Sequence, residues 1–184
     1  MITSSRLAVV SGGATGIGRE VARRFAEHGD RVVIIGRRAN LLHRASDEIN
    51  RAVASDRVVP INADLADPVQ VQRAADQIVE LGNVDVLVNN AGAIITPPAS
   101  EGLDALAASW RHDLDVNLIT AVLLTNALMD HLRRPGGRLI MVSSAAAQRG
   151  APARTQPGRM RRRRRRCTDG HSDWPGNSAK RALR

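Results

Sequence analysis

Short apolar runs alternate with longer amphipathic stretches over the first 150 residues of the chain. The apolar runs are rich in valine and isoleucine and show little polar alternation, which is typical of parallel strands buried on both faces of a sheet. The stretches between them have the length and the spacing of helices. The pattern therefore predicts the order βαβαβαβαβ, with strands at Leu7–Val10, Arg31–Ile35, Arg57–Ile61, Val84–Val88 and Arg138–Val142.

Two of the expected helices have clear limits. The first carries Ile17, Val21 and Phe25 at helical spacing and ends at Gly29, and the fourth runs from about residue 103 to about 133, before a Pro-Gly-Gly turn. Crossover connections between parallel strands are right-handed, and ligands of such sheets bind above the carboxyl ends of the strands. The predicted fold is α/β, a Rossmann-type doubly wound parallel sheet of five strands.

A glycine-rich loop separates the first expected strand from the first helix. Residues 11–18 read Ser-Gly-Gly-Ala-Thr-Gly-Ile-Gly. Glycines let the backbone turn tightly and approach a pyrophosphate, and the following helix N-terminus offers N–H groups and a positive dipole. The spacing alone also fits a plain glycine-rich turn, but its place between a strand and a helix favours a dinucleotide site.

Charge and composition divide the chain near residue 150. Residues 1–150 hold 16 Arg and 16 Asp or Glu, whereas residues 151–184 hold 11 Arg or Lys against two Asp, a net charge of +9. The second segment is rich in Arg, Pro, Gly and Ser, and its run Arg161–Arg166 is self-repelling. We therefore predict an NAD(P)-binding domain over 1–150 and a non-homologous, disordered Arg-rich tail over 151–184.

Other sequence features bear on the location of the protein and on disulfides, membrane spans and metal sites. The chain has one cysteine, no charged-then-apolar leader, and no uncharged run long enough to cross a bilayer, the apolar run Val116–Met129 being 14 residues long. The five histidines show no paired spacing typical of a metal site. We therefore expect a cytoplasmic protein with no internal disulfide, no membrane span and no metal.

Three further motifs fall at the expected carboxyl edge of the sheet: Asn-Asn-Ala-Gly at 89–92, Asp-Val-Asn at 115–117 and Ser-Ser at 143–144. With the glycine loop, in this order and at these separations, they resemble the short-chain dehydrogenase/reductase family. The resemblance covers residues 1 to about 150. It implies an oxidoreductase that uses NAD(H) or NADP(H) to oxidise an alcohol or reduce a carbonyl, and that forms homo-oligomers.

The resemblance also implies roles for single residues. Asn117 would hold a proton-relay water, and Ser144 would hydrogen-bond the substrate oxygen. The implied cofactor-binding residues are Ser11, Gly12, Gly16, Ile17 and Gly18 at the pyrophosphate, Asp64 and Leu65 at the adenine, and Asn90, Ala91 and Gly92 at the ribose and the route to the nicotinamide. Plainer interpretations remain: Asn90 as a turn residue, Asn117 as a polar residue on a helix face, and Ser144 as a strand-end hydrogen-bonding group.

Charge at the end of the second strand bears on the cofactor. A carboxylate there would accept from a ribose 2′-OH and repel a 2′-phosphate, whereas arginine pairs with that phosphate. The sequence has Arg37 and Arg38 and no acid at this place. We therefore favour NADP(H) over NAD(H), the alternative being that both arginines cap a solvated loop.

The resemblance stops before the family's catalytic pair, a Tyr and a Lys four residues later. The chain contains no Tyr, and Lys180 is its single lysine, in an Asn-Ser-Ala-Lys sequence that has no Tyr four residues earlier. The family's last two strands, their helices and part of its oligomer interface also have no counterpart in the pattern. We therefore expect a truncated and catalytically impaired chain whose fifth strand is an unprotected edge.

Three functional hypotheses follow. The first is an impaired NADP(H)-dependent oxidoreductase acting on a small alcohol or carbonyl compound. The second is a non-catalytic dinucleotide-binding remnant, and the third is a binder of nucleic acid through the phosphate contacts of Arg161–Arg166. A reading-frame change near residues 151–159 would account for the abrupt arginine-rich tail, because shifted GCC alanine codons read as CGC arginine codons.

Overall fold

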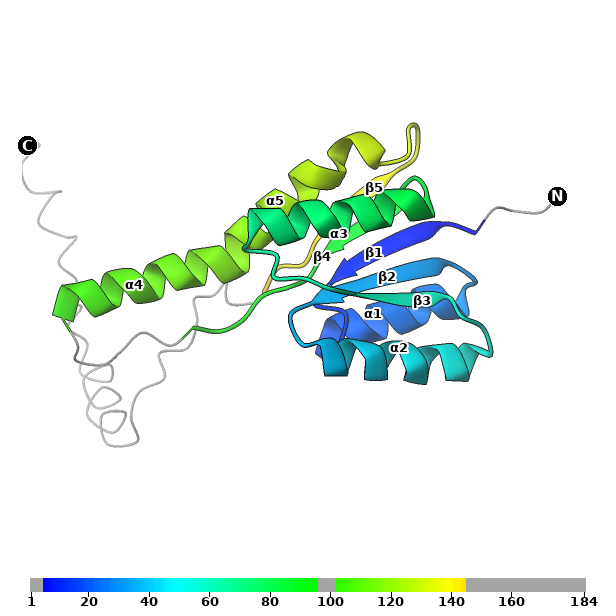
Figure 1. The fold of residues 1–184 in the computed structure, drawn as a ribbon, viewed down its shortest axis with the longest axis horizontal. Helices are drawn as coiled ribbons and strands as arrows, with labels where there is room; N and C mark the ends of the chain where they lie inside the picture. The colour runs from blue at the N-terminus through cyan, green and yellow to red at the C-terminus, as the bar shows by residue number, and fades with distance from the viewer. Residues whose placement is uncertain (1–4, 96–101, 145–184) are drawn as a thin grey trace, which may run out of the picture. The chain divides into compact units, whose positions relative to one another are not determined.

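A computed structural model gives the structure of the chain and describes residues 5–95 and 102–144. The chain divides into two compact units, Met1–Ser143 and Ser144–Arg184. The fold described below is that of the first unit (Figure 1). The Arg-rich tail expected over 151–184, with Arg161–Arg166, lies outside the described residues, so its disorder and the domain boundary near 150 stay predictions.

Among the described residues, the sheet has five strands in the order β3-β2-β1-β4-β5, and every neighbouring pair is parallel. The chain runs outward from β1 to β3 and then returns to place β4 on the other side of β1. This reversal makes a switch point beside β1, where ligands of doubly wound sheets bind. The predicted α/β class is confirmed, with strands β1 (Leu7–Ser11), β2 (Arg31–Gly36), β3 (Val58–Asn62), β4 (Val86–Asn89) and β5 (Arg138–Met141).

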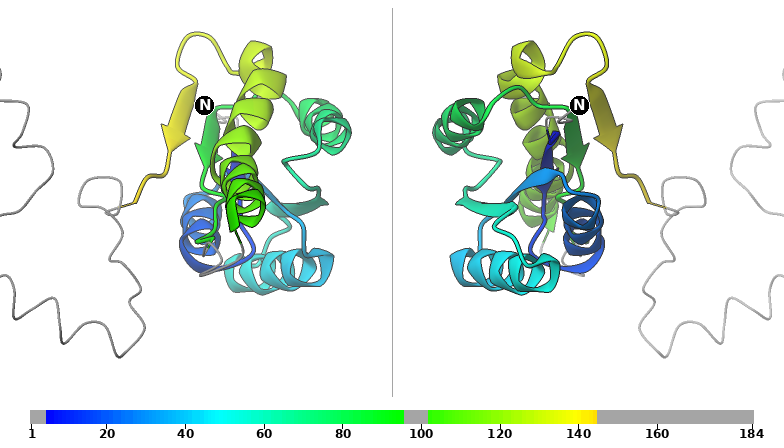
Figure 2. Two further views of the ribbon diagram at one scale, coloured as in Figure 1. Left: turned by 90° about the vertical axis from the view of Figure 1, so that its left-hand side faces the viewer. Right: turned by 90° about the vertical axis from the view of Figure 1, so that its right-hand side faces the viewer.

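Helices cover both faces of the sheet, as the turned views in Figure 2 show. Val32 and Ile34 of β2 pack on the side of α1 (Gly16–Glu27) and α2 (Ala39–Val53). On the opposite face, Val33 and Ile35 join the core formed with α3 (Pro68–Leu81) and α5 (Thr120–Leu128). Burial on both faces explains why β2 is apolar throughout instead of alternating.

The long helix expected over about 103–133 is a continuous helical run made of four consecutive segments. These are α4 (Gly102–Leu114), the π-helical η1 (Asp115–Ile119), α5 and the 3₁₀ turn η2 (Met129–His131). A π segment adds one residue to a helical turn and is frequent at functional sites. The predicted helix is present over nearly its whole length, since residues 102–131 are helical throughout, but the π segment within it was not predicted.

The strand β5 is the edge of the sheet in the part of the chain that the structure describes, since it pairs with β4 alone. Each of its four residues is exposed. By contrast, each residue of β1 is buried. The edge expected from the sequence is therefore present, with apolar side chains on both of its faces.

Candidate functional site

A cleft of about 520 Å³ opens at the carboxyl edge of the sheet. The turns after β1, β2, β3 and β4 converge there, and the π segment and the start of α5 add one flank. Its lining residues are Gly12, Ala14, Thr15, Ile17, Gly36, Arg37, Arg38, Ala63, Asp64, Leu65, Asn90, Ala91, Gly92, Ala93, Val116 and Thr120. The cleft lies at the switch point, where the sheet topology predicts a ligand.

The glycine loop is shaped by close backbone packing. Gly12 has φ +66°, a left-handed conformation that side chains disfavour, and its N–H donates to the Ile35 carbonyl at 2.8 Å. A Cβ at Gly18 would lie 2.4 Å from both the Gly12 carbonyl oxygen and Asn90 Nδ2. Glycine at both positions therefore keeps the start of α1 pressed against the strands.

The N-terminus of α1 faces the cleft without a side-chain cap. Thr15 is the N-cap residue, its side chain makes no capping hydrogen bond, and the first turn holds no acidic residue. The amide groups and the positive end of the helix dipole are thus left for a ligand. Thr15 and Ile17 line the cleft, and Ile17 is 66% exposed, so this predicted site residue offers an apolar wall.

Ser11 joins the turn after β1 to the turn after β4. Its side chain is 2% exposed, and its Oγ accepts from the N–H groups of Asn90 and Ala91, each at 2.9 Å. In return, Asn90 Nδ2 donates to the Ser11 carbonyl at 3.0 Å. Ser11 does not line the cleft, so its contribution to any ligand acts through these neighbours.

The far end of the cleft, beyond β2 and β3, is basic. Arg37 and Arg38 follow β2, line the cleft and are exposed, and neither forms an ion pair within residues 5–95 and 102–144. Asp64 follows β3, the strand next to β2, and also lines the cleft. Its Oδ1 accepts from the Ala66 N–H at 3.0 Å, which leaves the other carboxylate oxygen for a ligand donor.

Asn117 lies in the π segment and clamps the turn after β4. Its Oδ1 accepts from the Ala93 N–H at 2.9 Å, and its Nδ2 donates to the Ala93 carbonyl at 2.9 Å and to Asp113 Oδ1 at 3.1 Å. A Cβ at Gly92 would lie 2.8 Å from the same Oδ1. Asn117 therefore shapes the cleft wall, and its proton-relay role stays a prediction.

Ser144 is the first residue of the second unit and is exposed. Its predicted contact with the substrate oxygen therefore stays a prediction, as does a substrate site. Within the described ranges no cluster of His, Cys, Asp or Glu could hold a metal ion. None of the helices found between residue 5 and residue 144 combines the length and apolarity needed to span a bilayer.

Most of the predicted cofactor residues come together in the structure. Gly12, Ile17, Arg37, Asp64, Leu65, Asn90, Ala91 and Gly92 line the cleft, whereas Ser11, Gly16, Gly18 and Asn117 lie outside its lining. Sequence reasoning missed Ala63, next to Asp64, and also Ala93, Val116 and Thr120. The place of the last three depends on the π segment and on the Asn117–Ala93 contact, for which the sequence has no local signal.

A glycine cradle, an uncapped helix N-terminus and a basic end at a switch point together define a dinucleotide-binding α/β domain. The sequence model of the short chain dehydrogenase family matches residues 6–156. The chain therefore belongs to the short-chain dehydrogenase family.

Particular relatives agree with this assignment. The chain is 37% identical over 147 residues to granaticin polyketide synthase putative ketoacyl reductase 2 of Streptomyces violaceoruber, covering 79% of this chain and 57% of that protein. A structure of L-sorbose reductase from Gluconobacter frateurii with NADPH and L-sorbose superposes with a TM-score of 0.71 at 29% identity, over 80% of this chain and 56% of that one. A short chain dehydrogenase from Burkholderia cenocepacia in complex with NADP gives a TM-score of 0.67 at 35% identity, over 80% and 58%. The chain thus spans little more than half the length of these relatives.

Proposed function

We propose that the chain binds NADP(H) in the cleft beside β1 and derives from an oxidoreductase of alcohols and carbonyl compounds. The observation that carries this proposal is the pair Arg37 and Arg38 at the end of β2, in a cleft that also holds the glycine loop. Guanidinium groups pair with phosphate through charge-assisted hydrogen bonds. The NADPH and NADP complexes of the similar structures support the same cofactor.

The proposed cofactor would lie across the switch point. The 2′-phosphate would pair with Arg37. The adenine would lie beside Asp64 and Leu65, where the Asp64 carboxylate can accept from its amino group and the Leu65 backbone can contact its ring. The pyrophosphate would rest on the N-terminus of α1 and the loop around Gly12. The ribose and the route to the nicotinamide would follow the turn of Asn90, Ala91 and Gly92.

The cofactor, when bound, would supply or accept a hydride. The chain's own residues would hold the dinucleotide, fix the cleft wall through the Asn117–Ala93 contact and neutralise phosphate charge at Arg37. The resemblance adds Ser144 as a hydrogen-bond donor to the substrate oxygen. The proton for a reduced carbonyl needs a further acid, and the chain has no Tyr to provide it.

We therefore propose that turnover is poor. Loss of a positioned general acid lowers rates by about 10²–10⁴. The test is NADPH oxidation by the full 184-residue chain with a panel of simple ketones, with trace rates expected. Turnover in the ordinary enzyme range, on the order of 1–10³ s⁻¹, would overturn the proposed impairment.

A second candidate is a dinucleotide-binding protein without catalysis, favoured by a cleft that most of the predicted cofactor residues line, in a chain that lacks Tyr. It differs from the first in one measurement: cofactor binding with no hydride transfer to any ketone.

The basic run Arg161–Arg166 remains a third proposal, as a phosphate-contacting nucleic-acid segment. Six neutralised phosphates would give a slope of log K against log salt of roughly −5 on duplex DNA, with no sequence preference. A cytoplasmic location stays a prediction.

Cofactor choice is tested by titrating NADP⁺ and NAD⁺ against the full chain. We expect tighter NADP⁺ binding, and an Arg37→Asp variant should lose about 10- to 100-fold of that affinity, the size of one charged hydrogen bond. Arg73→Asp is the matched control, since Arg73 is an exposed arginine of α3 outside the cleft lining. Equal affinities of the wild type for both cofactors, or an equal loss in the control, would discard the assignment.

A further inference from the structure

A carboxylate outside the cleft accepts a hydrogen bond from the side chain that shapes one of its walls. Asp113 is half-buried in the last turn of α4, and its Oδ1 accepts from Asn117 Nδ2 at 3.1 Å. Asp113 is absent from the cleft lining and from the motifs that carry the resemblance. Asp113 can therefore affect a ligand in the cleft only through Asn117.

The orientation of the Asn117 amide decides whether the clamp exists. With Oδ1 on the Ala93 N–H and Nδ2 on the Ala93 carbonyl, both bonds form at 2.9 Å. Rotating the amide by half a turn would place donor against donor and acceptor against acceptor, and both bonds would be lost. An ionised carboxylate is acceptor-only, so Asp113 pairs with Nδ2 and selects the productive orientation.

The clamp joins the two walls at one end of the cleft. Ala93 and Gly92 belong to the turn after β4, whereas Val116 and Thr120 come from the helix that carries Asn117. This end lies across the switch point from Arg37 and Asp64, because β4 and β2 flank β1 on opposite sides. If adenosine occupies the arginine end, the clamped end receives the other half of the dinucleotide.

We propose that Asp113 is a positioning residue for the nicotinamide half of the cofactor. It acts by holding the Asn117 amide in the orientation that fixes Ala93, and hence the width of the cleft at that end. The proposal rests on the proposed dinucleotide function and deepens it, by assigning one half of the ligand to the clamped end.

The test compares two ligands on the full chain. NADP⁺ reaches both ends of the cleft, whereas adenosine 2′,5′-bisphosphate carries only the adenosine half. In Asp113→Leu, which removes the acceptor, we expect NADP⁺ to bind about tenfold more weakly, the loss expected from one charge-assisted hydrogen bond. Binding of the bisphosphate should stay unchanged.

Three controls make the result specific. Asp104→Leu makes the same change of charge and size on the same helix, at an exposed aspartate that lies outside the cleft lining and has no side-chain partner in the described ranges, and should leave both affinities unchanged. Asp113→Asn keeps an acceptor oxygen and should restore most of the NADP⁺ affinity. Asp113→Ala decides the matter if the leucine variant does not fold, which thermal unfolding monitored by circular dichroism reports.

The outcomes separate the two proposals. Equal NADP⁺ affinity in the wild type and in Asp113→Leu overturns the positioning role while leaving the cofactor site intact. An equal loss for NADP⁺ and the bisphosphate also overturns it, because a general loosening of the fold would act on both halves. If the wild type binds neither ligand, the proposed function itself fails, and the assignment of Asp113 falls with it.

Discussion

The strands β2 and β5 are alike in sequence and opposite in environment. Both are parallel and rich in branched apolar residues. Ile34 and Ile35 of β2 are 0% exposed, whereas Leu139 and Ile140 of β5 are 42% and 43% exposed. Composition makes a segment fit for a buried strand, but the neighbouring strands and the helices that cover it decide whether it is buried.

The two strands differ in exposure because they differ in the number of neighbouring strands and covering helices. β2 lies between β1 and β3 and under helices on both faces, while β5 has β4 on one side in the described residues. Deletion of side-chain atoms should therefore be expensive at β2 and nearly neutral at β5. The same reasoning separates the tightly packed turns of the cofactor cleft from the exposed end of the sheet.

The largest effect should come from the core of β2. Ile34→Ala should lower the free energy of unfolding by about 2–5 kcal/mol, because it leaves a cavity among side chains that cannot collapse into it. The matched change Ile140→Ala in β5 should lower it by less than about 1 kcal/mol. Urea unfolding followed by circular dichroism measures both, and equal losses would show that β5 is covered in solution.

The next effect should come from the Ser11 latch. Ser11→Ala removes the acceptor of two N–H groups near the cleft, and leaving such groups unpaired should lower the free energy of unfolding by about 1–3 kcal/mol. Ser11→Thr keeps the hydroxyl and should restore most of it. Ser143→Ala, at an exposed serine two residues after the end of β5, is the control in the same urea measurement, and a loss there as large as at Ser11 would contradict the comparison.

Self-association should report the exposed edge directly. An unpaired strand with apolar residues on both faces is a template for pairing with another chain, so we expect concentration-dependent association of the wild type. Ile140→Lys should reduce it, as measured by sedimentation velocity. Val69→Lys, at a 58% exposed valine of α3, should not, and an equal reduction by both variants would assign the effect to net charge.

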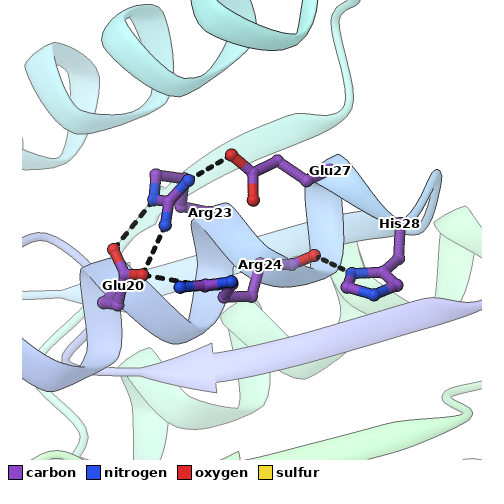
Figure 3. A network of polar contacts seen from close by, with 5 residues as sticks. All are labelled: Glu20, Arg23, Arg24, Glu27 and His28. Atoms are coloured by element: carbon purple, nitrogen blue, oxygen red, sulfur yellow. Dashed lines mark hydrogen bonds and ion pairs between the residues drawn. The ribbon is translucent and has the colours of Figure 1, made fainter.

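The smallest effect should come from an exposed ion network on α1, drawn in Figure 3. Hydrogen bonds from Arg23 and Arg24 lower the pKa of Glu20 from 4.5 to about 2, with the Arg24 Nε donating at 3.0 Å. Because the folded-state pKa is depressed, the stabilisation is present above about pH 4.5 and is lost as the pH falls towards 2.

Glu20→Gln should therefore flatten the stability profile slightly between pH 4.5 and 2, and solvent screening keeps the change small. A carboxyl titration of Glu20 followed by NMR provides the direct measurement. A midpoint near the ordinary glutamate value would show that the network does not persist in solution. Glu80→Gln, at a glutamate of α3 without an ion-pair partner in the described part of the chain, is the control.

The structural features that could be predicted were those that depend on residues close together in the sequence. The apolar runs locate the strands, and the glycines of residues 11–18 locate a turn between a strand and a helix, because each signal lies within a few residues. The Asn117–Ala93 clamp and the Ser11–Asn90 latch join residues 24 and 79 positions apart. Such contacts depend on the register of strands and on the π segment, which no local pattern reports.

The π segment also determines how the side chains of α4 are rotated about the helix axis relative to those of α5. Trp110, Leu114, Leu118 and Val122 follow one another at intervals of four, and in a regular α-helix each interval overshoots a full turn by about 40°. The π segment Asp115–Ile119, which contains Leu118, takes up one residue more per turn and offsets part of that rotation. The four side chains, each about half exposed at 58%, 47%, 50% and 51%, thereby stay closer to one line than α-helical phase would allow. Deleting one residue from the segment would turn α4 by about 100° relative to α5 and so move the row of Trp110 and Leu114 out of line with Leu118 and Val122.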